Sequence, residues 1–346
     1  MTATMLFVLL SAFFLAVVNG ANDVSKGIAT LVGSAVTDLR RGIMIGAIFT
    51  GFGALAGAGF LTDTARTFGS DLLVEGTVPT PAAAIAVVLG AGLCVLIATI
   101  LAIPISTTHA IVGAMGGVGI VAFGMQNVRL GAVILKVAIP LALSPLLAFG
   151  MTVALTRFML AQKEKGTGSG RADTIVGSMS TQMVDKFAQS HWFVACGTCF
   201  GRGMLDAPKL LALPLAAGTL SGNNDIQYAL FLIIAGGMVV GSVLGGAKVT
   251  KTMSERITRI GSGSGFVAAL VTALLVNAAA VTELPIATTQ VSFTAIVGTS
   301  MGAHGGQRLN MATVRRALIA WLLTLPVAAL MGIAVYSVVA HLVPAP

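Results

Sequence analysis

The sequence contains few charged residues. Asp, Glu, Lys and Arg make up 9% of the 346 residues, whereas a soluble domain carries roughly 25%. Hydrophobic residues make up 56% of the chain, and the mean hydropathy is +0.96. A soluble globular protein is therefore excluded. A chain of this length has room for about ten to twelve helices that cross or half-cross a membrane.

Features typical of enzymes and of secreted proteins are also scarce. The sequence has no recognisable nucleotide-binding loop or convincing set of metal ligands, so we do not expect an enzyme. Cys196 and Cys199 have C-x-x-C spacing without a second pair, which indicates packing residues rather than a redox or metal site. The first apolar run follows no basic segment and precedes no clear Ala-x-Ala site, so we expect it to stay as the first helix.

The net charge of +8 does not predict a nucleic-acid partner. Membrane proteins collect Lys and Arg in their cytoplasmic loops, and that bias accounts for the excess. We therefore expect membrane lipid, and no nucleic acid, around this chain.

Apolar segments occur in two sets, separated by a polar stretch that is rich in glycine, serine and charge. This composition is typical of a linker. The expected organisation is an N-terminal transmembrane repeat over 1–160, a linker over 161–186 and a C-terminal transmembrane repeat over 187–346. The apolar segments run approximately over 5–19, 27–36, 42–60, 82–103, 109–124 and 131–160, and then over 187–201, 208–220, 226–247, 263–282, 286–303 and 313–340.

Two motifs occur once in each set. Pro-Ile-Ser-Thr-Thr-His begins at Pro104 and Pro-Ile-Ala-Thr-Thr-Gln at Pro285, an offset of 181 residues. Gly20–Lys26 and Gly203–Lys209 share the pattern Asp-x-x-Lys at an offset of 183 residues. A duplicated fold explains this agreement better than chance, and transporters are commonly built from such repeats.

Loop charges predict that the two repeats have opposite orientations. Equivalent loops of opposite charge bias lie on opposite sides of a membrane. The prediction is an all-α polytopic membrane protein with two inverted-topology repeats, broken helices, and re-entrant hairpins at 82–124 and 263–303. Both termini are expected outside the cell, with the linker in the cytoplasm. The loop over 61–81 holds Asp63, Asp71 and Glu75 against Arg66, and its counterpart over 248–259 holds Lys248, Lys251, Arg256 and Arg259 against Glu255.

The Thr-Thr motifs are candidate anion sites. Proline interrupts a helix, and irregular backbone at membrane depth is tolerated only against protein or a water-filled cavity. The hydroxyls and free N–H groups that begin the next half-helix suit a phosphate-like anion. One copy alone favours a simple kink, but the duplication favours binding. The candidate residues are Ser106, Thr107 and Thr108 in the first copy, and Thr288 and Thr289 in the second.

The duplicated Asp-x-x-Lys pairs are the second candidate. Asp23 and Lys26, like Asp206 and Lys209, would share one helix face and neutralise each other. The structural interpretation is an ion pair that lets a broken helix enter the membrane. The functional interpretation, which the duplication favours, is that each lysine faces the anion while each aspartate binds a cation or a proton. Pro208 predicts a broken helix in the second copy.

The motifs Gly20–Val24 and Pro104–Gly113 resemble the inorganic phosphate transporter (PiT) family, and Gly241–Ile257 is similar to a further family segment. The resemblance spans both repeats. It implies a secondary transporter with inverted repeats that carries phosphate with a coupling cation, often as a homodimer in the plasma (inner) membrane. It also assigns substrate and cation sites to Asn22, Asp23, Ser106, Thr107, Thr108, Asp206, Thr288 and Thr289.

The chain departs from the family pattern at several of these positions. Lys26 and Lys209 stand where asparagine is common, Leu205 replaces an asparagine, Ala287 replaces a serine, and Arg202 stands where histidine is common. Lost amide oxygens weaken a sodium site, which would use Asn22 and Asp23, and added ammonium groups can replace a bound cation. The departures put sodium coupling in doubt and make proton coupling plausible.

The function expected from the sequence is a secondary active importer of an inorganic oxyanion, with phosphate first and cation-coupled symport by alternating access. No cofactor is expected beyond a coupling sodium ion. The alternatives are a sulfate permease of the same fold and, less favoured, an anion channel. Sequence alone leaves open the roles of Arg202 and of Glu283, which stands two residues before Pro285.

Overall fold

The computed structural model describes residues 3–60, 68, 74, 77–166, 181–217 and 224–343. The acidic residues of the loop over 61–81 and the central part of the predicted linker lie outside this range. The topology prediction depends on the charges of these loops, and it therefore stays a prediction from sequence.

All regular elements of the described residues are helical. Seven helical segments are long and apolar enough to cross a membrane, and the shorter Thr107–Phe123 is also apolar. The N-terminal set comprises α1 (Ala3–Asp23), α2 (Ser25–Gly33), α3 (Leu39–Ala56), the short 3-10 helix η1 (Gly57–Phe60), α5 (Pro81–Ile100), α6 (Thr107–Phe123), η2 (Met125–Asn127), α7 (Leu130–Ala132), the π-helix η3 (Val133–Ala138) and α8 (Ile139–Gly166). The C-terminal set comprises α9 (Thr181–Ala216), α10 (Asn224–Glu255), α11 (Ser262–Val281), α12 (Thr288–His304) and α13 (Met311–Leu342).

Side-chain caps explain where several helices begin. Thr80 accepts a hydrogen bond from the backbone N–H of Ala83 and precedes Pro81, which suits the first helical position of α5. Asn310 caps α13 in the same way. The Asp38 side chain caps α3 by accepting a hydrogen bond from the backbone N–H of Arg41. This hydrogen bond lowers the pKa of the exposed Asp38 carboxyl.

The N-terminal motif interrupts its helix, but the C-terminal motif does not. α1 ends at Asp23 and α2 begins at Ser25, whereas α9 runs without a break through Pro208. The predicted break at Pro208 is therefore wrong. Proline removes one backbone donor, which frees the carbonyl of Met204 four residues earlier. The backbone of Gly57 approaches that carbonyl closely, since a Cβ on Gly57 would lie 2.8 Å from it. Gly57, at the start of η1, therefore packs over the carbonyl that the proline leaves without its helical donor.

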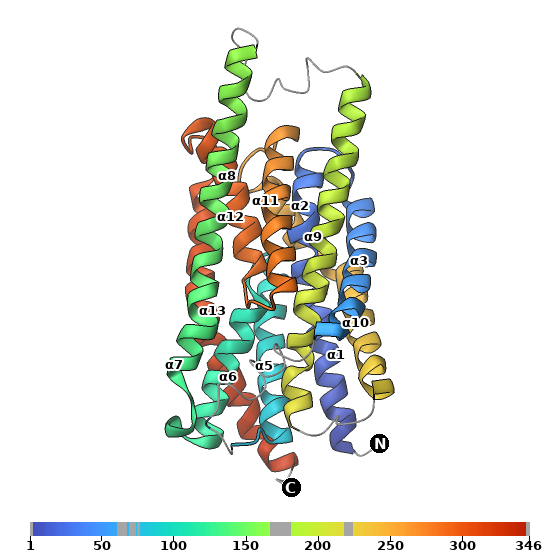
Figure 1. Ribbon diagram of the computed structural model, residues 1–346. Helices are drawn as coiled ribbons and strands as arrows, with labels where there is room; N and C mark the ends of the chain where they lie inside the picture. Colours follow the sequence, from blue (N-terminus) through green and yellow to red (C-terminus); the bar gives the residue numbers. More distant parts are fainter. Residues whose placement is uncertain are drawn as a thin grey trace.

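Two helical hairpins enter the molecule from opposite ends (Figure 1). The hairpin of α5 and α6 lies in the half that carries both chain termini, and the hairpin of α11 and α12 lies in the other half. Their tips meet near the middle, where the Thr289 hydroxyl donates a 2.7 Å hydrogen bond to the Ile105 carbonyl. An inverted repeat requires this arrangement. The exact repeat, and the re-entry of each hairpin, stay predictions.

Both hairpin tips begin with the same backbone conformation. Ala102 and Glu283, at equivalent positions, have the left-handed φ values of 57° and 54°. The following residues, Ile103 and Leu284, donate to carbonyls five residues back, at 2.8 and 3.0 Å. This is the Schellman ending of a helix, in which glycine is the usual left-handed residue. The structure thus gives Glu283 a place at the helix end.

The helices of one half pack against those of the other in matching pairs. α1 packs on α10 while α3 packs on α9, and α6 packs on α13 while α12 packs on α8. Glycines permit the first two contacts, because a side chain at Gly20 would overlap the backbone of Met238 and one at Gly203 would overlap that of Thr50. Small residues allow this close approach of membrane helices.

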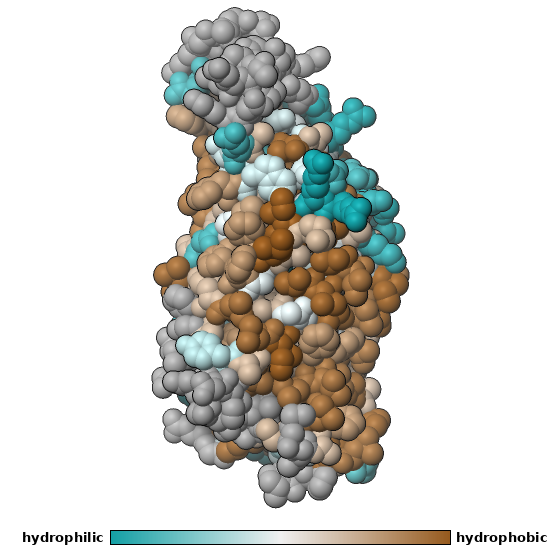
Figure 2. All heavy atoms as spheres, turned by 90° about the vertical axis from the view of Figure 1, so that its right-hand side faces the viewer, coloured by the Kyte–Doolittle hydropathy of each residue, from teal (hydrophilic) through white to brown (hydrophobic). Residues whose placement is uncertain are grey.

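One face of the molecule is hydrophobic over most of its height (Figure 2). α3 and α10 lie on this side of the molecule in Figure 1 and carry exposed apolar side chains, among them Phe52 and Leu244. Hydrophilic side chains gather towards the end opposite the chain termini (Figure 2). The exposed residues Arg40, Arg41, Lys251 and Arg256 belong to the helix ends there. Such a surface is that of a multi-pass membrane protein.

Candidate functional site

Five ionisable side chains are buried together where α1, α2 and α9 meet the first hairpin tip. Their residues are between 0% and 4% exposed. We call this set the central charge cluster, and it comprises Asp23, Lys26, Arg202, Asp206 and Lys209. Three cations and two carboxylates give it a formal charge of +1. Burying charge costs several kcal/mol per ion unless partners compensate it.

Each predicted Asp-x-x-Lys pair forms an ion pair, as the sequence spacing indicated. Lys26 contacts the Asp23 carboxylate across the break between α1 and α2. Lys209 lies 3.3 Å from Asp206 within α9. The pairing is confirmed, while the predicted roles of these residues in binding stay predictions.

Arg202 is fully buried and completes the cluster. Its Nη2 donates a 2.7 Å hydrogen bond to the Thr50 hydroxyl of α3, and its Nη1 donates one of 3.3 Å to Asn19 Oδ1. The same Nη1 lies 4.0 Å from Asp206. Among the described residues, its Nε has no hydrogen-bond partner. The guanidinium is thus held beside the carboxylates with one donor unused.

Asn19 joins the two halves of the site, and sequence reasoning missed it. Its Nδ2 lies 3.1 Å from Thr107 Oγ1, 3.1 Å from Asp23 Oδ2 and 3.4 Å from Asp206 Oδ2. An amide nitrogen has two hydrogens, so it satisfies two of these three acceptors at a time. The repeat offset of 183 residues places Asn19 opposite Arg202, and this offset could have drawn attention to both residues.

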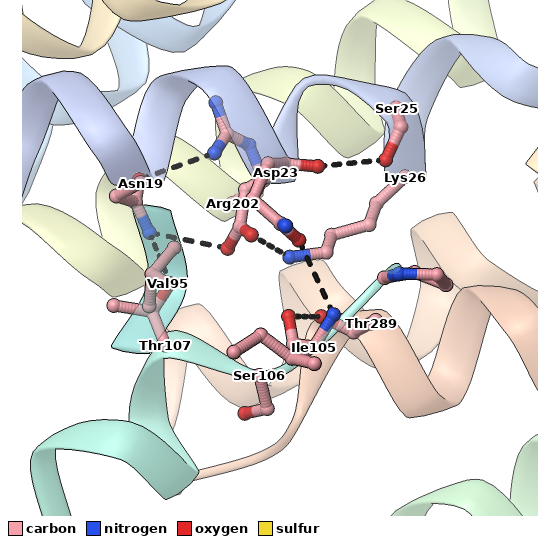
Figure 3. Close-up of polar contacts among 12 residues, drawn as sticks. Asn19, Asp23, Ser25, Lys26, Val95, Ile105, Ser106, Thr107, Arg202 and Thr289 are labelled. Carbon is pink, nitrogen blue, oxygen red and sulfur yellow. Dashed lines mark hydrogen bonds and ion pairs between the residues drawn. The ribbon is translucent and has the colours of Figure 1, made fainter. Parts of the chain in front are cut away.

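The first hairpin tip is bound to the charge cluster (Figure 3). Asn19 donates to the hydroxyl of Thr107, and Lys209 donates to that of Thr108 at 3.3 Å. Ser106 has a local role, since its hydroxyl accepts the backbone N–H of His109 and caps α6. All three hydroxyl-bearing residues are buried, as the candidate anion site requires.

Asn22 holds the same tip through its whole amide group. Its Oδ1 accepts from the Ile105 N–H at 3.3 Å, and its Nδ2 donates to the Ile103 carbonyl and the Thr99 hydroxyl. The structure therefore places Asn22 against the tip backbone. A sodium ion at Asn22 and Asp23 would have to compete with these contacts.

The second tip differs. α12 begins at Thr288 after Ala287, which supplies no side-chain cap. Thr288 and Thr289 are both buried. The Thr289 hydroxyl donates to the Ile105 carbonyl of the opposite tip, so it must turn away from that carbonyl before it can donate to an anion.

His109 and Gln290, which follow the two Thr-Thr pairs, face elsewhere. Both line an apolar cavity of about 650 Å³ between α6, α8, α12 and α13. Cys94, Cys196 and Cys199 are free thiols.

Comparison with known proteins agrees with this geometry. Residues 19–332 match the model of a family described as the phosphate transporter family. The chain is 29% identical over 327 residues to a probable low-affinity inorganic phosphate transporter of Bacillus subtilis, covering 93% of this chain and 92% of the relative. It is 25% identical to a putative phosphate permease of Haemophilus influenzae, with 94% of each chain covered.

A solved structure titled the sodium-dependent phosphate transporter has the same fold. It aligns with a TM-score of 0.81 at 23% identity, covering 97% of this chain and 99% of the other. At this identity the match supports the architecture alone.

Proposed function

The chain belongs to the phosphate transporter family, and we propose that it is a secondary transporter that imports inorganic phosphate together with a cation. The observation that carries this proposal is a buried cluster of net charge +1 beside the meeting point of two hairpin tips. Burying charged side chains at membrane depth costs free energy, so charged residues found there usually line the path of a transported ion or substrate.

The charge of the cluster supports phosphate as the substrate. A phosphate monoanion, which is abundant near neutral pH, makes the site neutral. A permanent dianion such as sulfate leaves it at −1 unless a cation enters as well. We propose phosphate first, with sulfate as the alternative of the same fold.

The contacts of the first tip support a binding mode. Lys209 and Asn19 now donate to the hydroxyls of Thr108 and Thr107. We propose that an entering phosphate takes over these donors and also accepts from the freed hydroxyls. Ser106, Thr288 and Thr289 complete the proposed anion site, and Lys26 supplies counter-charge from the other half. The second tip closes on the anion as Thr289 leaves Ile105.

We propose a proton rather than sodium as the coupling cation. A metal ion of this kind needs several oxygen ligands. The carboxylates of Asp23 and Asp206 already face Lys26, Lys209 and Asn19, and the amide oxygen of Asn22 accepts a backbone N–H. Tethered cations thus occupy the place that a mobile ion would fill. A proton on Asp23 or Asp206 changes the charge of the site without needing a coordination shell.

We propose an inverted two-fold repeat, 1–160 against 187–346, that works by alternating access. The opposite entry of the two hairpins and the matching helix pairs support it. α8 ends and α9 begins at the end opposite both termini (Figure 1), and that end carries exposed arginines and lysines. The positive-inside rule then places it, with the linker, in the cytoplasm and both termini outside. Family resemblance alone supports a homodimer.

Uptake of labelled phosphate into proteoliposomes tests the proposal. We expect saturable uptake that an inward proton gradient drives, that arsenate inhibits strongly and that sulfate inhibits weakly. Replacing sodium by choline should change it little. Unitary currents would show a channel instead, and stronger uptake of labelled sulfate would make the chain a sulfate permease.

A further inference from the structure

A second cavity lies at the end of the molecule that carries the exposed basic residues. It has a volume of about 270 Å³ and is lined by the end of α2, the second half of α8, the connection from α10 to α11, the start of α11 and the end of α12. Figure 1 shows α2, α8, α11 and α12 side by side in the half opposite the chain termini. A cavity of this size holds several waters or a hydrated ion. None of the residues of the central charge cluster lines it.

Two buried residues that line this cavity have hydroxyls without a partner among the described residues. Thr156 of α8 is 6% exposed and Ser300 of α12 is 4% exposed. Neither hydroxyl oxygen has a hydrogen-bond partner among the described residues. A buried polar group left unpaired costs about 1–3 kcal/mol, so a ligand in this cavity that reached the two hydroxyls would remove that cost.

The other polar groups of the cavity are mostly donors. α11 begins at Ser262 after Gly261, which has no side chain to cap the first N–H groups, and the start of a 20-residue helix attracts anions. The exposed Arg259 adds a positive charge. The described lining residues include no carboxylate.

The carbonyl groups at the other two helix ends are already used. At the end of α2, the N–H groups of Ser34 and Val36 cap the carbonyls of Thr30 and Leu31. At the end of α12, those of Gly305 and Gly306 cap Met301 and Ser300. The cavity therefore offers a tetrahedral anion N–H, hydroxyl and guanidinium donors, while its described lining offers a cation hydroxyl oxygens but no carboxylate.

We propose that this cavity is a second oxyanion site, which holds inorganic phosphate on its way between the central charge cluster and the cytoplasm. Thr156, Ser300, Arg259 and the N–H groups that begin α11 bind the anion. α2 connects the two sites, since Lys26 and Gly33 are seven residues apart, or about 10 Å along a helix. This inference rests on the proposed function for the identity of the anion.

Equilibrium dialysis of the purified full chain in detergent with labelled inorganic phosphate tests the proposal. We expect two classes of site. Thr156→Val with Ser300→Ala should remove one class, and Arg259→Gln, a surface change that does not threaten folding, should weaken that class at least tenfold. Thr152→Val is the matched control. Thr152 lies one turn earlier on α8, is buried and has an unpartnered hydroxyl, but does not line the cavity. This variant should keep both classes.

Thr107→Val with Thr288→Val separates the two proposals, because it should remove the central class and leave the cavity class. If the wild type bound phosphate only at the cavity class and not at the central class, this result would contradict the proposed function. If only one class of phosphate site were found, and its affinity were unchanged by Arg259→Gln and by Thr156→Val with Ser300→Ala, the proposal of a second site would be overturned. Repeating the titration in phosphatidylcholine and phosphatidylglycerol nanodiscs shows whether a lipid headgroup, rather than free phosphate, occupies the cavity. Loss of the cavity class there would assign the cavity to lipid and overturn the proposal for free phosphate.

Discussion

The two halves of the chain carry the same acid–base pair but surround it differently. Asp23 and Lys26 correspond to Asp206 and Lys209. The residue four positions before each aspartate is Asn19 in the first half and Arg202 in the second, and these two side chains are hydrogen-bonded to each other. The excess positive charge of the site therefore comes from one substitution within a duplicated motif. A repeat can supply a symmetric frame, and single positions can then adapt it to a charged substrate.

The hairpin tips show the same division between frame and adaptation. Their backbones are alike, with left-handed residues at Ala102 and Glu283. Their side-chain contacts are not, because the first tip is bound to Asn19 and Lys209 while the second reaches the first through Thr289. We infer that Asn22 keeps the first tip in place through its backbone contacts and that the second tip moves when the anion enters.

The largest expected effect separates the two lysines. Lys26→Met leaves Asp23 buried with Asn19 as its remaining hydrogen-bond partner, and breaking such a buried ion pair costs about 3–5 kcal/mol. Lys209→Met should cost at least about 1 kcal/mol less, because Arg202 stays 4.0 Å from Asp206. Thermal unfolding in detergent measures both. Equal losses, or a larger loss for Lys209→Met, would show that Arg202 does not compensate Asp206.

The next effect compares the two tips. Thr107→Val and Thr288→Val each remove a hydroxyl that we expect to bind the anion. A hydrogen bond to a charged partner contributes about 1.5–3 kcal/mol, so phosphate affinity should fall tenfold or more in each variant. Phosphate binding to the folded variants measures this. An effect at one tip alone would sharpen the comparison into a one-sided site, and unchanged affinity in both would remove these residues from it.

Sequence reasoning predicted the parts of this site that repeat. The helical hairpins, the Thr-Thr tips and the two ion pairs all follow from motifs that occur twice. The apolar segments agree with the helices, except that 187–201 and most of 208–220 belong to the single helix α9. It missed Asn19 and Thr50, because a lone asparagine or threonine in an apolar run looks like an ordinary back-bonded side chain. It also predicted a break at Pro208 instead of an unbroken α9. Both errors concern contacts between segments distant in the chain, which no local pattern reveals.

A smaller effect concerns the coupling ion. Lys26→Asn restores the residue that is common in the family and removes one tethered cation beside Asp23. We expect wild-type uptake to change by less than about threefold when choline replaces sodium, which is within about 1 kcal/mol. The variant should depend on sodium more strongly. Uptake into proteoliposomes across about two pH units around neutral measures both. Strong sodium dependence in the wild type, without a response to a proton gradient, would make the lysines structural partners only.

The smallest expected effect tests the shared backbone of the tips. Ala102→Gly and Glu283→Gly place the favoured residue at a left-handed position, which relieves about 1–2 kcal/mol of strain. The flexible unfolded chain offsets about 0.5–1 kcal/mol of this gain. Both variants should therefore unfold within about 1 kcal/mol of the wild type, and Ala102→Gly should be on the stable side. A matched pair of variants at Ala98 and Ala279, which are helical in α5 and α11, should instead lose about 1 kcal/mol on change to glycine. If Glu283→Gly alone were destabilising, its carboxylate would have a role beyond the helix ending, and the two tips would differ in charge as well as in their contacts.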